Sequence, residues 1–397
     1  MRCSPPPRCS SRFADTPTRS AEACAIGGSP FSRTRYGSSS QRFSCFALPA
    51  RPSWPSPASS ATGRSIGALD AMFTAVSAVC VTGLIVRDTP VDFSIFGQGV
   101  ILALIQLGGL GIMTFSTAAI AALGRRLSVR HEGAVAGLLS NQHRGDLFAA
   151  TRSILLVTAV AEGLGFLLLA GLFAAHGDPA GAALWRGLFT SVSAFCNAGF
   201  SLQSDSLIGF NSSPAIVYTV AALIVVGGIS PVTMAAIPRL ARRGQATLQT
   251  KIILAATGVL LAAGLMVILT LEWHHALRGF SVPDRIHNAV FQSVTPRTAG
   301  FNTLDLTEFR PLTLTLLMIL MAIGGSPGGT AGGIKTTTAA VMFFVVAAAL
   351  RGRTEASAFG RRIAPQAVFR TAAVAMFGLL AVVAAFSRCV SRRIFRR

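Results

Sequence analysis

The stretch "AVSAVCVTGLIV", Ala75 to Val86, decides the fold expected for this chain. It is apolar and rich in β-branched residues, as a membrane helix is, but it contains Thr82 and Gly83 and is followed at once by Arg87. A helix needs about 20 apolar residues to cross a bilayer, so this stretch is too short to span one. We expect a half-helix that enters the membrane, turns at the glycine and returns.

The same pattern occurs twice more, in "SVSAFCNAGFSL" (191–202) and "SVTPRTAGFNTL" (293–304). Each copy has a phenylalanine nine or ten residues before its glycine: Phe73 and Gly83, Phe189 and Gly199, Phe291 and Gly300. An apolar span, a basic loop and another apolar span separate the copies. Because internal repeats outrank local signals in assigning a fold, we expect repeated units of helix, half-helix, glycine turn and helix.

The composition is that of a membrane protein. The chain is 51% apolar and 13% charged, with a mean hydropathy of +0.58, whereas soluble domains carry about 25% charged residues. Apolar runs long enough to form or approach membrane spans occur at 97–123, 154–175, 215–237, 252–271, 312–323 with 336–350, and 367–386.

The net charge of +20 follows the topology and does not indicate nucleic-acid binding. Three connections hold the larger set of basic residues and are therefore expected on the cytoplasmic side: Arg125, Arg126, Arg130, Arg144, Arg152; Arg239, Arg242, Arg243, Lys251; Arg351, Arg353, Arg361, Arg362, Arg370. The opposite connections hold Arg87, Arg186, Arg278, Arg285, Arg297 and Arg310. The half-helices would then enter from outside the cell.

The three glycine turns are candidates for a pore lining. Irregular backbone at membrane depth is stable only where protein or a water-filled cavity covers it. Glycine adopts positive φ without a Cβ clash, so successive carbonyls can replace an ion's hydration shell, as in potassium filters. The alternative is that the glycines only allow close helix packing. The candidate filter residues are Val81, Thr82, Gly83, Asn197, Ala198, Gly199, Thr298, Ala299 and Gly300.

A second irregular segment, "GGSPGGTAGGIKTTT" (324–338), interrupts an apolar run. Glycine and proline do not sustain a helix there, so we expect a loop that breaks a membrane helix and moves beneath a filter. Lys335 either repels ions in a closed state or extends to the cytoplasmic interface. The candidate gating residues are Gly324, Gly325, Ser326, Gly328, Gly329, Thr330, Gly332, Gly333 and Lys335.

Other chemistry has little support in the sequence. Glu162 is a charge inside an apolar run, for which we expect a hydrogen bond across helices or support of the pore. No nucleophile–base pair or zinc-binding spacing of Cys and His occurs, so we expect no enzyme. Gly333-Ile334-Lys335-Thr336 follows a membrane helix and departs from a phosphate-binding loop. A secondary transporter with broken helices would pair inverted halves, unlike three repeats in one direction.

The motifs "SAVCVTGL", "AFCNAGF" and "TPRTAGFNT" resemble the first three filter loops of the membrane subunits of Trk/Ktr potassium-uptake transporters. Residues 324–338 resemble the intramembrane gating loop of that family, closer to the Ktr branch. The resemblance covers roughly Ser59 to Phe386. It implies an all-α polytopic membrane protein built of repeated helix–pore-half-helix–filter-loop–helix units around a central pore.

The resemblance also implies the activity and its partners. We expect potassium uptake, often sodium-stimulated, with K⁺ bound at the filter and no cofactor in this chain. The expected assembly is a homodimer with one pore in each subunit, surrounded by membrane lipid and resting on a cytosolic regulatory ring that binds the nucleotide. The expected location is the bacterial cytoplasmic membrane, as a multi-pass protein.

Against the family pattern of four repeats, we expect these segments: 1–60, non-homologous; 61–135, a first repeat without its preceding helix; 140–245, a second; 250–350, a third, with the gating loop at 324–338; 365–386, the first helix of a fourth; and 387–397, a basic tail.

Residues 1–60 read as a disordered tail, an organelle transit peptide or an out-of-frame segment. The helix that breaks off at Phe386 into Arg, Ser and Cys favours the last. A pore needs four quadrants, and an arginine-rich segment opposes translocation. The alternative function is therefore a non-conducting remnant or an interaction partner of the same family.

Overall fold

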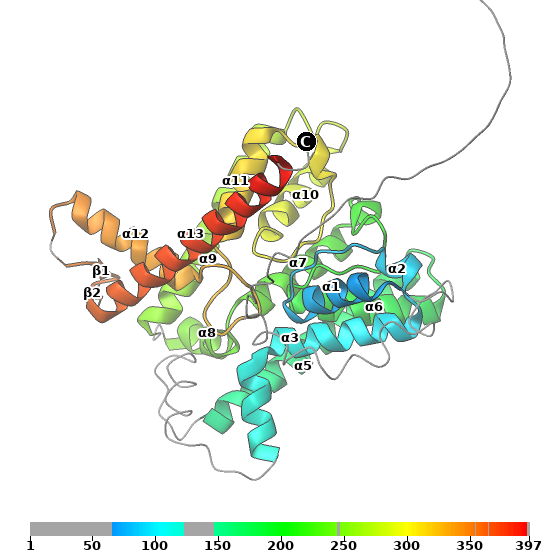
Figure 1. The fold of residues 1–397 in the computed structure, drawn as a ribbon, viewed down its shortest axis with the longest axis horizontal. Helices are drawn as coiled ribbons and strands as arrows, with labels where there is room; N and C mark the ends of the chain where they lie inside the picture. The colour runs from blue at the N-terminus through cyan, green and yellow to red at the C-terminus, as the bar shows by residue number, and fades with distance from the viewer. Residues whose placement is uncertain (1–65, 123–146, 244–246, 354, 364, 395–397) are drawn as a thin grey trace, which may run out of the picture. The chain divides into compact units, whose positions relative to one another are not determined.

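The computed structural model describes residues 66–122, 147–243, 247–353, 355–363 and 365–394 (Figure 1). The expectations for residues 1–60 and for most of the first basic loop lie outside these ranges. Helices make up most of the described chain. The two strands in it, Ser357–Ala358 (β1) and Arg361–Arg362 (β2), form a two-residue hairpin turned by Phe359 and Gly360, which both have positive φ.

The described α-helices range from 4 to 30 residues in length and are labelled in Figure 1. Their bounds are α1 Ala68–Val79, α2 Thr89–Asp92, α3 Ile95–Ala122, α5 Leu147–Ala175, α6 Ala180–Phe195, η4 Ile208–Phe210, α7 Pro214–Gly228, α8 Pro231–Arg243, α9 Leu248–Glu272, α10 Val282–Val294, η5 Leu306–Glu308, α11 Pro311–Ala322, α12 Thr336–Leu350 and α13 Pro365–Ile394.

Three short helices, α1, α6 and α10, end just before the three glycine turns. They are 12, 16 and 13 residues long, so each is too short to span a bilayer. α1 packs against α3, α6 packs between α5 and α7, and α10 packs against α9 and α7. Each of these short helices, expected to be half-helices, is thus held by at least one longer neighbour.

Two described helices are long and apolar enough to cross a membrane, Ile154–Ala175 within α5 and Leu248–Glu272 in α9. Several shorter apolar helices accompany them, among them α7, α11 and α12. α3 is interrupted at Gly111, whose backbone has φ 75° and ψ 150°. The bend at Gly111 divides the first long apolar run.

Two expectations about helix ends are wrong. The apolar run 215–237 is two helices, because α7 ends at Gly228 and α8 begins at Pro231. Proline disfavours the helical conformation of the residue before it and has no N–H to donate, so Ser230 cannot continue α7. The last helix, expected to end at Phe386, continues to Ile394.

The core joins the repeats to one another. One apolar cluster combines residues of α5, α6 and α7 with Phe291 and Val294 of α10 and with Phe301 beyond the third turn. A second combines α1, α3 and α6 with Phe200 beyond the second turn. The two clusters share the half-helix α6, which therefore positions the second turn between its neighbours.

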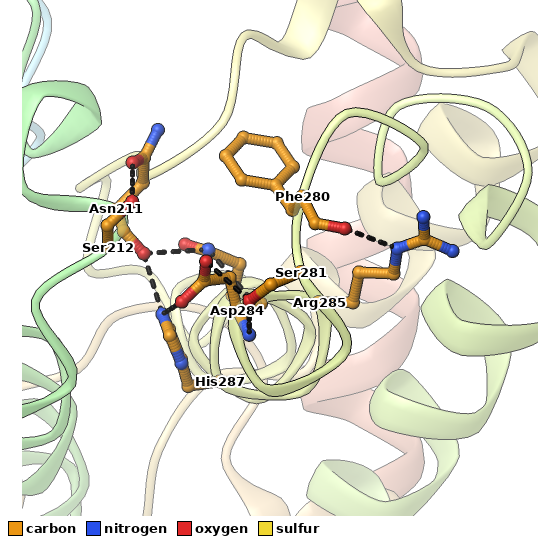
Figure 2. A network of polar contacts seen from close by, with 8 residues as sticks. Asn211, Ser212, Phe280, Ser281, Asp284, Arg285 and His287 are labelled. Carbon is orange, nitrogen blue, oxygen red and sulfur yellow. Dashed lines mark hydrogen bonds and ion pairs between the residues drawn. The ribbon is translucent and has the colours of Figure 1, made fainter.

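A polar network fixes the start of α10 against the second repeat (Figure 2). Ser281 caps α10, accepting from the Asp284 N–H and donating its hydroxyl to the Asp284 carboxylate at 2.7 Å. His287 Nε2 and Asn288 Nδ2 both donate to the backbone oxygen of Asn211, at 2.6 and 2.9 Å. Asn211 lies in the loop between η4 and α7, and this loop therefore sets where α10 begins.

A buried carboxylate joins the end of α9 to the start of α11. Glu272 is fully buried and accepts hydrogen bonds from the Thr313 hydroxyl and, at 3.1 Å, from the Arg310 N–H. Its second oxygen lies 3.4 Å from the Ala276 nitrogen and 3.4 Å from His275 Nδ1. These partners offset the cost of removing a carboxylate from water.

We expect Thr313→Val to destabilise the protein by about 1–3 kcal/mol, because it keeps the side-chain shape but removes a donor to a buried carboxylate. The melting temperature of the purified protein measures this effect. The matched control is Thr315→Val on the same helix, where an exposed hydroxyl bonds only the Pro311 carbonyl; its expected change is within about 0.5 kcal/mol. Equal losses in the two variants would contradict the role of Glu272.

Candidate functional site

The three glycine turns share a pattern of positive φ angles. In each, a non-glycine residue with positive φ is followed two positions later by a glycine with positive φ. The angles are 54° and 75° at Val81 and Gly83, 58° and 73° at Asn197 and Gly199, and 64° and 82° at Thr298 and Gly300. Left-handed backbone is costly for residues with a Cβ. Its recurrence at matching positions indicates one conformation built three times.

The turns also lie next to one another in space. A Cβ on Gly199 would be 2.6 Å from the Ala299 oxygen and 3.1 Å from the Gly300 Cα, and a Cβ on Gly83 would overlap the Ala198 oxygen. The second turn therefore lies between the first and the third. A backbone oxygen of one turn thus lies against the glycine of the next, although the turns are far apart in the sequence. The repeats in the sequence predict that the turns come together.

Side chains beside the turns hold them in position. Ser193 Oγ donates to the Phe200 oxygen at 2.7 Å, and Thr295 Oγ1 donates to the Phe301 oxygen at 2.6 Å. Each of these bonds joins the end of the short helix to the residue that follows the glycine of its turn. Asn197 Nδ2 donates to the Arg297 oxygen at 3.1 Å and links the second turn to the third.

Residues 323–335 form the break between α11 and α12. Because α12 begins at Thr336, the expected gating loop 324–338 is too long by one helical turn of threonines. The two ends of the break are tied together, since Gly324 N–H donates to Ile334 O at 2.9 Å and Ile334 N–H donates to Ala322 O at 3.0 Å. The break is therefore a closed, folded loop.

The loop binds the end of α7 through backbone groups that no helix satisfies. Ser326 N–H donates to Gly228 O at 2.9 Å, and Thr330 N–H donates to Gly227 O at 3.0 Å. Ser326 Oγ accepts from the Ser230 N–H at 2.6 Å. The break between α7 and α8 and the break between α11 and α12 thus satisfy each other's hydrogen bonds.

The loop also contacts the end of α6, just before the second turn, and the third turn itself. Thr330 Oγ1 donates to the oxygen of Phe195, the last residue of α6, at 3.0 Å. The Gly332 N–H donates to Thr298 Oγ1 at 2.9 Å. Movement of the loop away from the turns would break both bonds, so its position and theirs are connected.

Arg297 is a site residue that sequence reasoning places wrongly. It was expected among the charges of the outer connections, but it is only 7% exposed. Its guanidinium donates to the Thr257 oxygen of α9 at 3.3 Å and to the Gly324 oxygen of the loop at 3.4 Å. The repeat holds a usable signal, since Arg297 stands immediately before the left-handed residue of its turn, where Cys80 and Cys196 stand in the others.

Glu162 makes the hydrogen bond across helices that was expected of it. Its carboxylate accepts from Gln106 Nε2 of α3 at 2.9 Å and lies 3.8 Å from the Cys196 sulfur. The Cys196 thiol also lies 3.6 Å from Gln106 Oε1. Two helices thus meet at the residue that precedes the second turn. Gln106 had no distinguishing signal in the sequence.

Lys335 bonds within its own loop. Its ammonium donates to the Ala331 oxygen at 2.7 Å, and the side chain is partly buried. Repulsion of ions and extension to the interface both stay predictions for this residue.

Comparison with known proteins identifies the family. The family model described as TrkH, cation transport protein, matches residues 51–396. This chain belongs to the TrkH family of cation transport proteins. The expected Trk/Ktr relationship is therefore confirmed, and the family makes the chain a membrane protein.

Individual members of the TrkH family align over most of the chain. The Ktr system potassium uptake protein B of Bacillus subtilis is 35% identical over 324 residues, covering 81% of this chain and 72% of that protein. The potassium/sodium uptake protein NtpJ of Enterococcus hirae is 35% identical over 312 residues, covering 78% and 69%.

A solved structure shows the same fold. The potassium transporter TrkH of Vibrio parahaemolyticus matches with a TM-score of 0.54 at 20% identity, over 77% of this chain and 62% of that one. The likeness supports an all-α fold.

The helices α7 and α6 approach each other so closely that there is no room for a side chain at Gly227. A Cβ there would overlap the Phe195 oxygen and lie 3.1 Å from Thr330 Oγ1. We expect Gly227→Ala to lower stability by about 1–3 kcal/mol through overpacking, measured by thermal unfolding. Gly258→Ala is the control, because its Cβ would meet nothing within 4 Å and should be neutral or slightly stabilising. A neutral Gly227→Ala would contradict the packing of α7 on α6.

Replacing Glu162 tests the Gln106 hydrogen bond. We expect Glu162→Leu to destabilise by about 0.5–2 kcal/mol, the range of polar contacts between membrane helices. Leucine occupies the corresponding place in the third repeat, because Ser191 bonds the Glu162 oxygen as Ser293 bonds the Leu261 oxygen. In a double-mutant cycle with Gln106→Leu, the double variant should lose less melting temperature than the sum of the two single losses. Strictly additive losses would mean that the two side chains do not interact.

Proposed function

We propose that this chain is a potassium-uptake transporter whose three turns line one cation pathway. The observation that carries the proposal is the convergence of Gly83, Gly199 and Gly300 in one left-handed conformation, with the carbonyl groups of Ala198 and Ala299 between them. Relatives named as potassium or potassium/sodium uptake proteins support the proposal. They favour transport over a non-conducting remnant.

The proposed filter works by replacing water with backbone oxygens. A cation sheds its hydration shell only where fixed oxygens take its place. Residues 81–83, 197–199 and 298–300 would supply these oxygens. Side-chain hydrogen bonds of Ser193, Thr295 and Asn197 would hold the second and third turns while leaving the carbonyl groups of 197–199 and 298–300 free for the ion.

We further propose that residues 323–335 are the gate of this pathway. The loop contacts the end of α6 through Thr330 and the third turn through Thr298, and its glycines allow a close approach to the end of α7. Gly325 and Gly329 would each place a Cβ 2.6 Å from the Gly228 oxygen. A segment held by hydrogen bonds to its neighbours, without a deep apolar core of its own, can move at low cost.

The finer properties of the transporter are part of the proposal. We propose that the repeats surround a central pore, that two chains form a homodimer, and that a cytosolic ring binding a nucleotide regulates uptake. Sodium stimulation is proposed on the same basis. These features rest on the family resemblance.

Ion flux tests the filter assignment. The purified chain in proteoliposomes should take up a rubidium tracer, with competition by potassium stronger than by sodium. Gly199→Ser should lower the preference for potassium over sodium by about tenfold, equivalent to about 1.4 kcal/mol, because its side chain would displace the Ala299 carbonyl group.

Gly258→Ser is the matched control, since it adds the same side chain at an open position on α9. Unchanged selectivity in Gly199→Ser, with uptake intact, would remove the second turn from the filter. Absence of rubidium uptake by the folded wild-type chain would contradict the transport function itself.

A further inference from the structure

An apolar groove with a volume of about 680 Å³ lies between α5 and α7. Leu156, Val160, Leu164 and Leu168 line it along α5, and Tyr218 and Ala222 line it on α7. Val160 and Leu164 are 52% and 57% exposed. The groove is therefore open to the surroundings of the helices, which in a membrane protein are lipid.

The length of the groove matches one leaflet of a bilayer. Leu156 and Leu168 are twelve residues apart on α5, which corresponds to about 18 Å at about 1.5 Å per residue. The hydrocarbon core of a bilayer is about 30 Å thick, so one leaflet occupies about 15 Å. A single extended acyl chain fits this length.

In the described part of the chain, one end of the groove lies close to exposed arginines. Arg152 is exposed and stands one helical turn before Leu156, at the end where Met234 of α8 completes the lining. α8 continues from Met234 to the exposed Arg242 and contains no acidic residue. No charged side chain lines the groove itself. The basic residues put this end on the cytoplasmic side.

We propose that this groove binds an acyl chain of an anionic phospholipid from the cytoplasmic leaflet, with its phosphate headgroup at Arg152. The apolar walls take the chain, and the cationic end selects a negative headgroup over a zwitterionic one. The proposal does not depend on which ion the protein carries.

The groove is separated from α6, the helix that leads to the second turn, by a single layer of residues. Gly165 lines it, and a Cβ on Gly165 would lie 2.5 Å from the Ser191 hydroxyl of α6. That hydroxyl donates to the Glu162 oxygen at 2.8 Å. A bound chain would therefore support the part of α5 that holds α6 and its turn.

Lipid binding to the purified full-length chain tests the headgroup. Native mass spectrometry would titrate dioleoyl-phosphatidylglycerol and dioleoyl-phosphatidylcholine, which share their acyl chains. We expect tighter binding of the anionic lipid. Arg152→Gln should weaken that binding about fivefold, as expected for one basic residue near a membrane surface, and should leave phosphatidylcholine unchanged. Arg353→Gln, at another exposed cytoplasmic arginine, is the control and should change neither.

Fluorescence quenching tests the place of the chain. Phosphatidylglycerol with brominated acyl chains should quench Tyr218→Trp more than Val259→Trp, an exposed apolar position on α9 outside the groove. Ala222→Trp should fill the groove and abolish the preferred site.

Three results would overturn the proposal: equal binding of the two lipids by the wild-type chain, unchanged binding in Arg152→Gln, or equal quenching at positions 218 and 259. The tryptophan at position 218 could instead be shielded from the quencher to an extent that depends on protein concentration and not on lipid. That result would assign the groove to a second copy of the chain.

Discussion

The need to satisfy backbone hydrogen bonds without water governs the described structure. In a bilayer, a helix can be broken only where other parts of the protein supply partners for the freed groups. The helix breaks described here meet this condition by pairing with one another. The end of α7 receives the N–H groups of the loop at 323–335, and the loop's hydroxyls and N–H groups reach the end of α6 and the third turn. The end of α7, the loop at 323–335, the end of α6 and the third turn thus form one connected set of hydrogen bonds.

Close approach of backbones makes this pairing possible. Gly227 lies against the Phe195 oxygen, where a Cβ would overlap it. Glycine is costly in a helix because it loses more entropy on folding, and here the lost stability is offset by hydrogen bonds that a larger residue would prevent. The glycine content of the loop therefore reflects contact with α7 as much as mobility.

Charged groups near these hydrogen bonds are held by carbonyl groups or amides. Arg297 reaches two backbone oxygens across α9 and the loop, and Lys335 bonds a backbone oxygen of its own loop. Glu162 accepts from an amide of a neighbouring helix. Lys335 stays within its loop, but the partners of Arg297 and Glu162 lie on other elements, so each of these two side chains joins segments that the sequence keeps apart. Its contribution is the orientation of those segments.

The sequence by itself determined that three short helices each end at a glycine turn, and it named the glycines. These features depend on short-range patterns: an apolar stretch too short to span, a glycine at a fixed distance, and a cluster of glycines inside an apolar run. Each restricts the local backbone wherever the segment lies, which is why Gly83, Gly199 and Gly300 could be named together. The expectation for Glu162 also followed locally, from one charge in an apolar run.

Only the tertiary structure decided what these segments touch. Pro231 marks the break after Gly228 in the local sequence, but the groups that bond the end of α7 lie about a hundred residues later, at Ser326 and Thr330. From the sequence, Arg297 is predicted to be a charge of an outer connection. In the folded chain it bonds backbone oxygens of α9 and of the loop at 323–335. Gln106 and Cys196 become partners of Glu162 through the packing of α3 and α6 on α5. Local sequence fixes backbone preference, whereas partner choice depends on packing between distant segments, and that packing appears only in the folded chain.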